Sequence, residues 1–260
     1  MKILLTNDDS LDSPLFRFAV THFSNMGEVK VVVPTEEQSW KGKSMTRFGK
    51  LVAKPLPGFG CEAFGFTGTP ADCANFGIYH VFDTKPDLVV SGVNMGSNVG
   101  LSFMISSGTV GAGLEANIAG LPAVALSQVL TSEAFQYWND ARKLSAELEA
   151  ELFKQMAEMI DRVFGLLQSK KDWMAEPVTW NVNMPAEPVP DWQVVETTLG
   201  RTFYTSCFKP EGQVYQHNID SPELDETPGS DGVVVRAGHV SVTRLDLRVM
   251  GQSTGEPKRP

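Results

Sequence analysis

Residues 3–33 have the sequence ILLTNDDSLDSPLFRFAVTHFSNMGEVKVVV. The stretch begins with the short run Ile3–Thr6 and ends with the β-branched run Val29–Val33, and both predict buried strands. Between them, Ser13-Pro14 is typical of a helix start, and apolar residues at helical spacing continue to Met26. A strand, a helix and a second strand in so short a stretch predict a βαβ unit with parallel strands.

The following residues continue this alternation as far as Pro185. Helices are predicted over Thr69–Val81, Thr109–Ala119 and Asp140–Gln168, and buried strands over Leu88–Ser91, Ala123–Ser127 and Val178–Val182. Long loops are predicted at 34–57 and 92–108. After Pro185 the pattern predicts strands of hairpins at Arg201–Phe208, Val214–Gln216 and His239–Leu247. We therefore expect an α/β core with a mostly parallel sheet over 1–185 and a β-rich extension over 186–260.

Composition narrows the possible classes of protein. A hydrophobic fraction of 42% and a charged fraction of 20% over 260 residues are ordinary for a soluble globular chain. The net charge of −9 disfavours binding to nucleic acid, although it does not exclude a small phosphorylated substrate. Cys61, Cys73 and Cys207 are odd in number and widely spaced, which favours reduced cysteines in the cytoplasm. No apolar run is long enough for a membrane span, and no secretory signal is recognisable.

Polar residues follow three of the predicted strands. Asp8-Asp9 lies after the first strand, Gln38-Ser39 in the loop after the second, and Gly92-Val93-Asn94 after the third. Functional loops of open parallel sheets gather beyond the carboxyl ends of the strands, so these segments should meet at one edge. Their hard oxygen ligands suit Mg²⁺, Mn²⁺ or Ca²⁺ rather than zinc. The alternative is that the acid pair only starts a turn and caps a helix.

A second candidate element is Ser106–Val110, which opens a predicted helix. Free backbone N–H groups and the helix dipole favour an anion at such a place, and Ser107 and Thr109 add hydroxyl groups. The alternative is a plain helix cap. The chain lacks both the Gly-x-Ser-x-Gly elbow of serine hydrolases and the Gly-x-Gly-x-x-Gly dinucleotide fingerprint after the first strand.

These residues resemble the SurE family, the stationary-phase survival nucleotidases. The resemblance spans nearly the whole chain and rests on Ile3–Asp9, Val33-Pro34, Gln38-Ser39, Gly68–Cys73, Pro86–Asn98, Ser106–Ala112, Asn181–Pro185, Ser230-Asp231, Gly238 and Val240–Thr243.

The resemblance implies a Rossmann-like, three-layer core and a metal-dependent 5′/3′-nucleotidase that acts on nucleoside monophosphates. It implies one divalent ion held by Asp8, Asp9, Ser39 and Asn94. It also implies a phosphate site lined by Asn98, Ser107, Gly108 and Thr109. A homodimer or homotetramer would assemble through the C-terminal extension.

The chain departs from the family pattern at three places. Ser10 stands where the family usually has glycine, and Gln38-Ser39-Trp40 replaces the usual Arg-Ser-Gly. Gln216 stands where an aromatic residue is common. These changes concern substrate preference and turnover more than the type of reaction.

The expected reaction is direct hydrolysis at a bound divalent ion. Asp8 or Asp9 would also orient or deprotonate the attacking water, while Asn98 and the helix N-terminus stabilise charge on the phosphoryl oxygens. Two alternatives stay open: a phosphatase with Asp8 as covalent nucleophile, and a nucleotide-sensing module without turnover. Adjacent acids, rather than the Asp-x-Asp spacing common in aspartyl-phosphate enzymes, count against the first.

Overall fold

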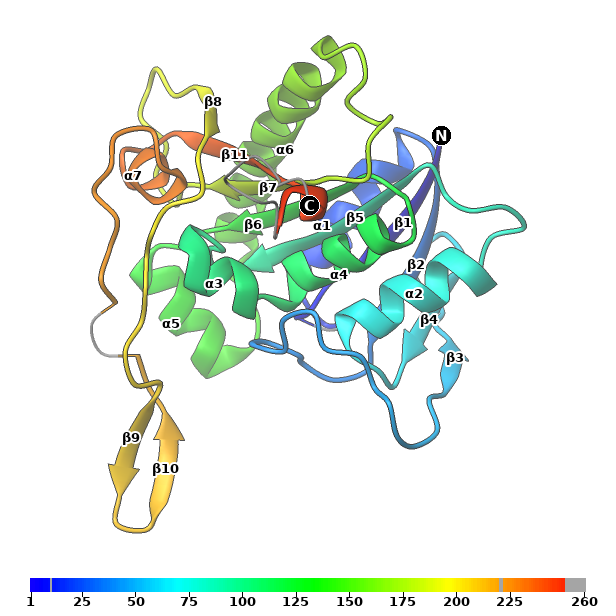
Figure 1. Ribbon diagram of the computed structural model, residues 1–260, viewed down its shortest axis with the longest axis horizontal. Coiled ribbons are helices and arrows are strands. Elements are labelled where there is room, and N and C mark those ends of the chain that lie inside the picture. The colour runs from blue at the N-terminus through cyan, green and yellow to red at the C-terminus, as the bar shows by residue number, and fades with distance from the viewer. Residues whose placement is uncertain (10, 220–221, 251–260) are drawn as a thin grey trace, which may run out of the picture.

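The computed structural model describes residues 1–9, 11–219 and 222–250. Within them, nine strands form one sheet in the order β3-β4-β2-β1-β5-β6-β7-β11-β8 (Figure 1). The strands of this sheet are β1 (Lys2–Thr6), β2 (Glu28–Pro34), β3 (Ala53–Pro55), β4 (Ala63–Phe66), β5 (Leu88–Met95), β6 (Ala123–Gln128), β7 (Thr179–Met184), β8 (Val194–Thr197) and β11 (Val240–Leu245). The pairs β3–β4 and β7–β11 are antiparallel and the other neighbours are parallel, which confirms the predicted mostly parallel sheet.

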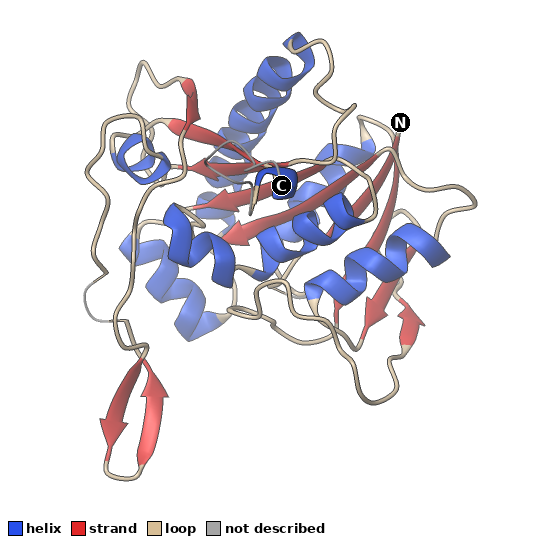
Figure 2. Cartoon of the chain, viewed as in Figure 1, coloured by secondary structure: helices blue, strands red, loops and turns tan. Residues whose placement is uncertain are grey.

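Helices cover both faces of this sheet, as Figure 2 shows. They are α1 (Pro14–Ser24), α2 (Pro70–His80), α3 (Gly100–Ser106), α4 (Gly108–Ile118), α5 (Ser132–Ala141), α6 (Ala146–Ser169) and α7 (Asp231–Arg236), with a 3₁₀ turn η1 at Leu247–Val249. Side chains alternate between the faces of a strand. Leu5 of β1 accordingly joins the core under α1 and α6, whereas Leu4 joins the core under α2. The three-layer α/β fold is thus confirmed.

The first βαβ unit forms because its local signals agree. Pro14 stands at the first turn of α1, where its missing N–H costs no hydrogen bond. Phe16 and Phe23 of this helix are buried against the sheet. β1 then pairs in parallel with β2, and on its other side with β5. This order places the ends of β2, β1 and β5 side by side.

Three predictions of elements are wrong. The helix predicted over Asp140–Gln168 starts too early: Arg142 adopts a left-handed conformation with φ 51° and ends the separate helix α5, and Ser145 caps α6, which covers the rest of the predicted range. The predicted loop 92–108 contains the end of β5 and all of α3. Arg201–Phe208 is not a strand, because its backbone follows α3: the Ser102 N–H donates to the Thr202 carbonyl at 3.2 Å.

The strands after Pro185 lie in two different places. β8 and β11 join the main sheet, so β11 is a strand as predicted but belongs to no hairpin. β9 (Phe208–Glu211) and β10 (Val214–His217) form an antiparallel hairpin that projects from the body of the molecule (Figure 1). The division into 1–185 and 186–260 stays a prediction. Nowhere in the described part of the chain is a helix both long and apolar enough to cross a membrane.

Candidate active site

The end of β5 and the residues that follow β1 and β2 lie together at the carboxyl edge of the sheet. The Gln38 N–H donates to the carbonyl of Asp8 at 2.8 Å, which fixes the loop after β2 against the end of β1. The Met95 N–H donates to Asp9 Oδ2 at 2.9 Å, which fixes the end of β5 against the same turn. The structure therefore brings the three polar segments to one place.

Asp8 is buried at the N-terminus of α4. The Thr109 hydroxyl donates to Asp8 Oδ1 at 2.6 Å, and the Thr109 N–H donates to Oδ2 at 3.1 Å. Gly108 permits this approach, because a Cβ atom there would lie 2.9 Å from the Asp8 Cβ. The anion at this helix N-terminus is thus a carboxylate of the chain itself.

Burial governs the electrostatics of the acid pair. Burial raises the pKa of Asp8, and the hydrogen bonds from Thr109 offset part of this effect. The pKa of Asp9 is raised well above its usual range, first by burial and then by the adjacent Asp8 carboxylate. Two neighbouring carboxylates in such surroundings favour the arrival of positive charge.

Asn94 and Asn98 complete the site through a shared partner on β6. Both side-chain amides donate to the Ser127 hydroxyl oxygen, Asn94 at 3.3 Å and Asn98 at 2.8 Å. A bulge between Ser91 and Asn94 lets β5 turn here. At Gly92, φ is 122° and a Cβ would lie 2.3 Å from the Leu126 carbonyl oxygen, so only glycine fits.

Two amides of β7 hold the loop that carries Asn98. The Asn98 N–H donates to Asn183 Oδ1 at 2.7 Å, and Asn181 Nδ2 donates to the Asn98 carbonyl at 2.9 Å. Sequence reasoning assigned no role to Ser127 or to these two amides. The available signal was a pair of amides two residues apart in a fully buried strand, where each needs a hydrogen-bond partner.

The donor set suits a hard divalent cation. Asp8, Ser39 and Asn94 line one polar cavity of about 270 Å³, and Asp9 and Ser39 line the cavity beside it. Carboxylate, hydroxyl and amide oxygens are ligands for Mg²⁺, Mn²⁺ or Ca²⁺. Among the described residues, 1–9, 11–219 and 222–250, no Lys or Arg forms an ion pair with Asp8 or Asp9. The same residues contain no group of three His, Cys, Asp or Glu side chains that could hold a metal ion elsewhere.

Residues 3–206 match the sequence model of the family described as "Survival protein SurE". This chain belongs to the SurE family. A protein of Methanopyrus kandleri named 5′-nucleotidase SurE is 33% identical over 96% of this chain and 93% of its own length. One of the same name from Methanocella arvoryzae is 33% identical over 97% of this chain and 95% of its own. The crystal structure of the SurE protein from Aquifex aeolicus matches with a TM-score of 0.72 and 28% identity, covering 96% of this chain and 97% of that one.

All eight residues that the SurE resemblance singled out lie at this site, but Gly108 and Thr109 do not line its two cavities. Asn98 and Ser107 line the same cavity as the expected metal ligands Asp8, Ser39 and Asn94. Thr109 is buried and contacts Asp8, and Gly108 packs against the same carboxylate. The assigned roles of all eight stay predictions.

Two of the three departures from the SurE pattern are described. Trp40 has φ 63°, a conformation that suits the glycine usual at this position in the family. Its ring packs edge-on against Phe103, Tyr204 and His217, with ring centroids 5.8, 5.4 and 4.8 Å away. Gln216 Nε2 donates to Glu211 Oε2 across the hairpin at 3.1 Å. Ser10 lies outside the described residues.

Proposed function

We propose that this chain is a divalent-metal-dependent nucleotidase that hydrolyses nucleoside 5′- and 3′-monophosphates to nucleoside and phosphate. The observation that carries the proposal is the pair formed by the buried Asp8 and the half-buried Asp9, which line two adjoining cavities and have no cationic partner in the described part of the chain. The 5′-nucleotidase names of the full-length relatives support the same reaction.

Asp8, Asp9, Ser39 and Asn94 would hold the ion. When bound, it would supply positive charge that stabilises the phosphoryl oxygens in the transition state. Asn94 suits this role because its Nδ2 donates to Ser127, which leaves Oδ1 for a cation.

The remaining polar groups of the cavity suit a phosphoryl group. Ser107 accepts a hydrogen bond from the Val110 N–H at 3.1 Å, so its hydroxyl hydrogen is available for a phosphate oxygen. Asn98 Nδ2 gives one hydrogen to Ser127 and keeps a second for the substrate. Donors fixed in this way stabilise charge without reorganisation.

Asp9 is better placed than Asp8 to orient and deprotonate the attacking water. Both oxygens of Asp8 accept hydrogen bonds from Thr109, which also makes Asp8 a poor covalent nucleophile. Asp9 accepts its hydrogen bond from Met95 through Oδ2. A carboxylate whose pKa is raised is a stronger base toward water.

The test is a panel of nucleoside 5′- and 3′-monophosphates, with the corresponding di- and triphosphates, assayed for phosphate release with Mg²⁺ and with Mn²⁺. The proposal predicts release from monophosphates of both kinds. Release from 5′-monophosphates alone would restrict the proposal to a 5′-nucleotidase, and no release from any nucleotide would reject it.

Assembly and location complete the proposal. We propose a homodimer or homotetramer that assembles partly through 186–250, where the projecting hairpin exposes Phe208 and Tyr215. A lone hairpin is marginal in water, so a second copy is a natural partner.

We also propose a cytoplasmic location, since Cys61, Cys73 and Cys207 form no disulfide.

A further inference from the structure

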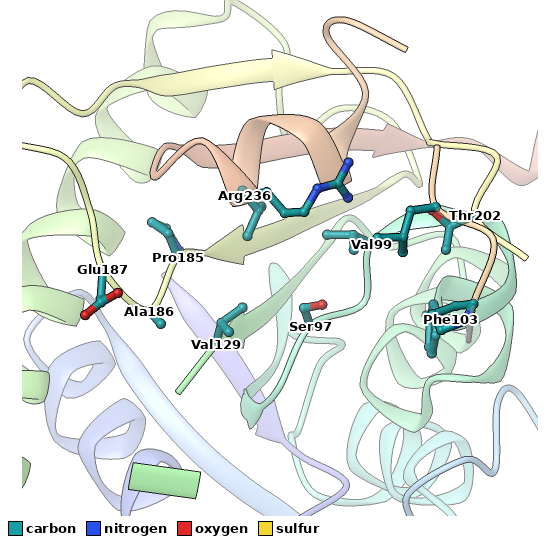
Figure 3. Close-up of a pocket in the computed structure, with 13 residues that line it drawn as sticks. Ser97, Val99, Phe103, Val129, Pro185, Ala186, Glu187, Thr202 and Arg236 are labelled. Atoms are coloured by element: carbon teal, nitrogen blue, oxygen red, sulfur yellow. The ribbon is translucent and has the colours of Figure 1, made fainter. Parts of the chain in front are cut away.

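A second cavity of about 450 Å³ lies beside the candidate active site. Figure 3 shows Phe103 and Thr202 at one end, Pro185 at the other, and Arg236 of α7 along one wall. Its volume falls within the range of small-molecule sites. None of the residues to which we have given a role in hydrolysis lines it.

The two cavities share walls. Ser97 and Phe103 line both, and Asn98, between Ser97 and Val99 in the chain, lies in the polar cavity. A phosphate held by Asn98 therefore has this second space next to it. Whatever the phosphate is esterified to can extend past Ser97.

The walls suit a flat, partly apolar group. Val99, Phe103 and Val235 offer apolar surface, and the ring of Phe103 can pack against an aromatic system. Arg236 adds a planar cation at the edge, held in place by hydrogen bonds from Nη2 to the Asp225 carbonyl at 3.0 Å and to Glu226 Oε1 at 3.1 Å. A mostly apolar lining with few fixed polar groups is typical of ligand pockets.

The cavity is held open by one buried acid. Asp231 accepts hydrogen bonds from the N–H groups of Gly100 at 2.9 Å, Gly200 at 3.0 Å and Gly232 at 2.8 Å. These glycines belong to α3, to the segment before Thr202 and to α7, which are three of the walls. Because the site is preformed, little conformational entropy is lost when a ligand binds.

We infer that this cavity binds the nucleoside of the substrate while its phosphate lies in the polar cavity. The inference rests on the proposed nucleotidase function. Besides Phe135, the other aromatic residue that lines the polar cavity but not the second one is Trp40. Its ring is already packed against Phe103, Tyr204 and His217, whereas the second cavity offers open space.

Gly232→Leu and Val235→Phe test the inference by filling the cavity. A Cβ at Gly232 would meet only the end of the Arg236 side chain, with Nη1 at 3.1 Å, and Val99 at 3.7 Å and beyond, so the backbone need not move. Val233→Phe is the matched control, because Val233 lies on the same helix but does not line the cavity. Thermal unfolding confirms that each variant folds.

Two readouts apply to each variant. The first is the ratio of kcat/KM for AMP to kcat/KM for p-nitrophenyl phosphate, and the second is calorimetric binding of adenosine. We expect both filling variants to lower the ratio by about tenfold or more and to weaken adenosine binding, with Val233→Phe like the wild type.

An unchanged ratio and unchanged adenosine binding in both filling variants would overturn the inference and leave the nucleotidase proposal intact. The same holds if Trp40→Ala alone lowers the ratio. If the wild type releases phosphate from neither ester yet binds adenosine, and the filling variants do not, the cavity assignment stands and the proposed hydrolysis falls. A wild type that binds no adenosine and does not prefer AMP overturns the inference.

Discussion

Thr109 and Asp8 form the contact on which the candidate site is centred. The sequence pattern placed Thr109 among phosphate ligands, because a hydroxyl at a helix N-terminus commonly binds an anion. In the structure both Thr109 groups bind the Asp8 carboxylate, and the hydroxyl contact is the shorter at 2.6 Å. Thr109 therefore orients an expected metal ligand.

Thr109→Val should weaken metal binding by about 10- to 100-fold, because it removes a hydrogen bond that holds a ligating carboxylate. Thr109→Ser keeps the hydroxyl and should stay close to the wild type. The measurement is activity titrated with Mg²⁺, together with inhibition by inorganic phosphate at saturating metal. A change in phosphate inhibition alone, with metal binding unchanged, would show that Thr109 binds phosphate and does not orient Asp8.

The raised pKa of Asp9 predicts a pH-dependent stability of the metal-free protein. The folded state binds protons on this acid more tightly than the unfolded state, so the free energy of unfolding falls as pH rises above the ordinary value of 3.8. Asp9→Asn removes this acid and relieves the repulsion on Asp8. The free energy of unfolding of this variant should therefore fall less steeply with pH than that of the wild type. Urea unfolding between about pH 4 and pH 7 in chelator measures both profiles.

Glu151→Gln, which changes an exposed acid on α6, serves as the control and should follow the wild type. Adding Mg²⁺ should restore stability near neutral pH in the wild type far more than in Asp9→Asn. Parallel profiles for the wild type and Asp9→Asn would contradict the account of the acid pair.

At the level of elements, the sequence was informative wherever local signals and burial agree. The unit β1-α1-β2 could be predicted because an apolar run, a helix start and a β-branched run follow one another. The split between α5 and α6 could not, because Arg142 takes a left-handed conformation that glycine or asparagine normally signals.

The same limit applies to the site. The meeting of Asp8, Ser39 and Asn94 could be predicted because each lies at or beyond the carboxyl end of a strand, and these ends mark the functional edge of a parallel sheet. Ser127 and Asn183 lie within strands, so their part in holding Asn98 becomes visible only once β6 and β7 are in register beside β5.

Ser127→Ala tests the support that β6 gives to the site. The change frees the amides of Asn94 and Asn98, so metal affinity and kcat/KM should fall by about 10- to 100-fold while the fold persists. Ser241→Ala is the matched control, since Ser241 is a buried serine on β11 with no hydrogen-bond partner for its hydroxyl in the described residues. Equal activity in the two variants would remove Ser127 from the account.

For the whole molecule, the main feature left unexplained by the core is the projecting hairpin. Val214 and Tyr215 of β10 are 63% and 66% exposed, and Phe208 of β9 is 59% exposed. Exposed apolar residues gathered on one small element are typical of an interaction surface. This is why we place part of an oligomer interface there.

Light scattering should give a mass of at least twice the 28.4 kDa of one chain. Phe208→Asp with Tyr215→Asp should shift the protein toward the monomer, because two charges would be buried without partners in the interface. Val52→Asp, at another exposed apolar residue, should not. A wild-type mass of one chain at micromolar concentration would reject the oligomer.

The central claim is that Asp8 and Asp9 hold a divalent ion that hydrolysis of nucleoside monophosphates requires. The most direct measurement is phosphate release from AMP by chelator-treated wild type, Asp8→Asn and Asp9→Asn, before and after Mg²⁺ or Mn²⁺ is added. The account predicts no release without metal, recovery in the wild type, and turnover lower by about a hundredfold or more in both variants. Full turnover in metal-free wild type, or wild-type turnover in either variant, would contradict it.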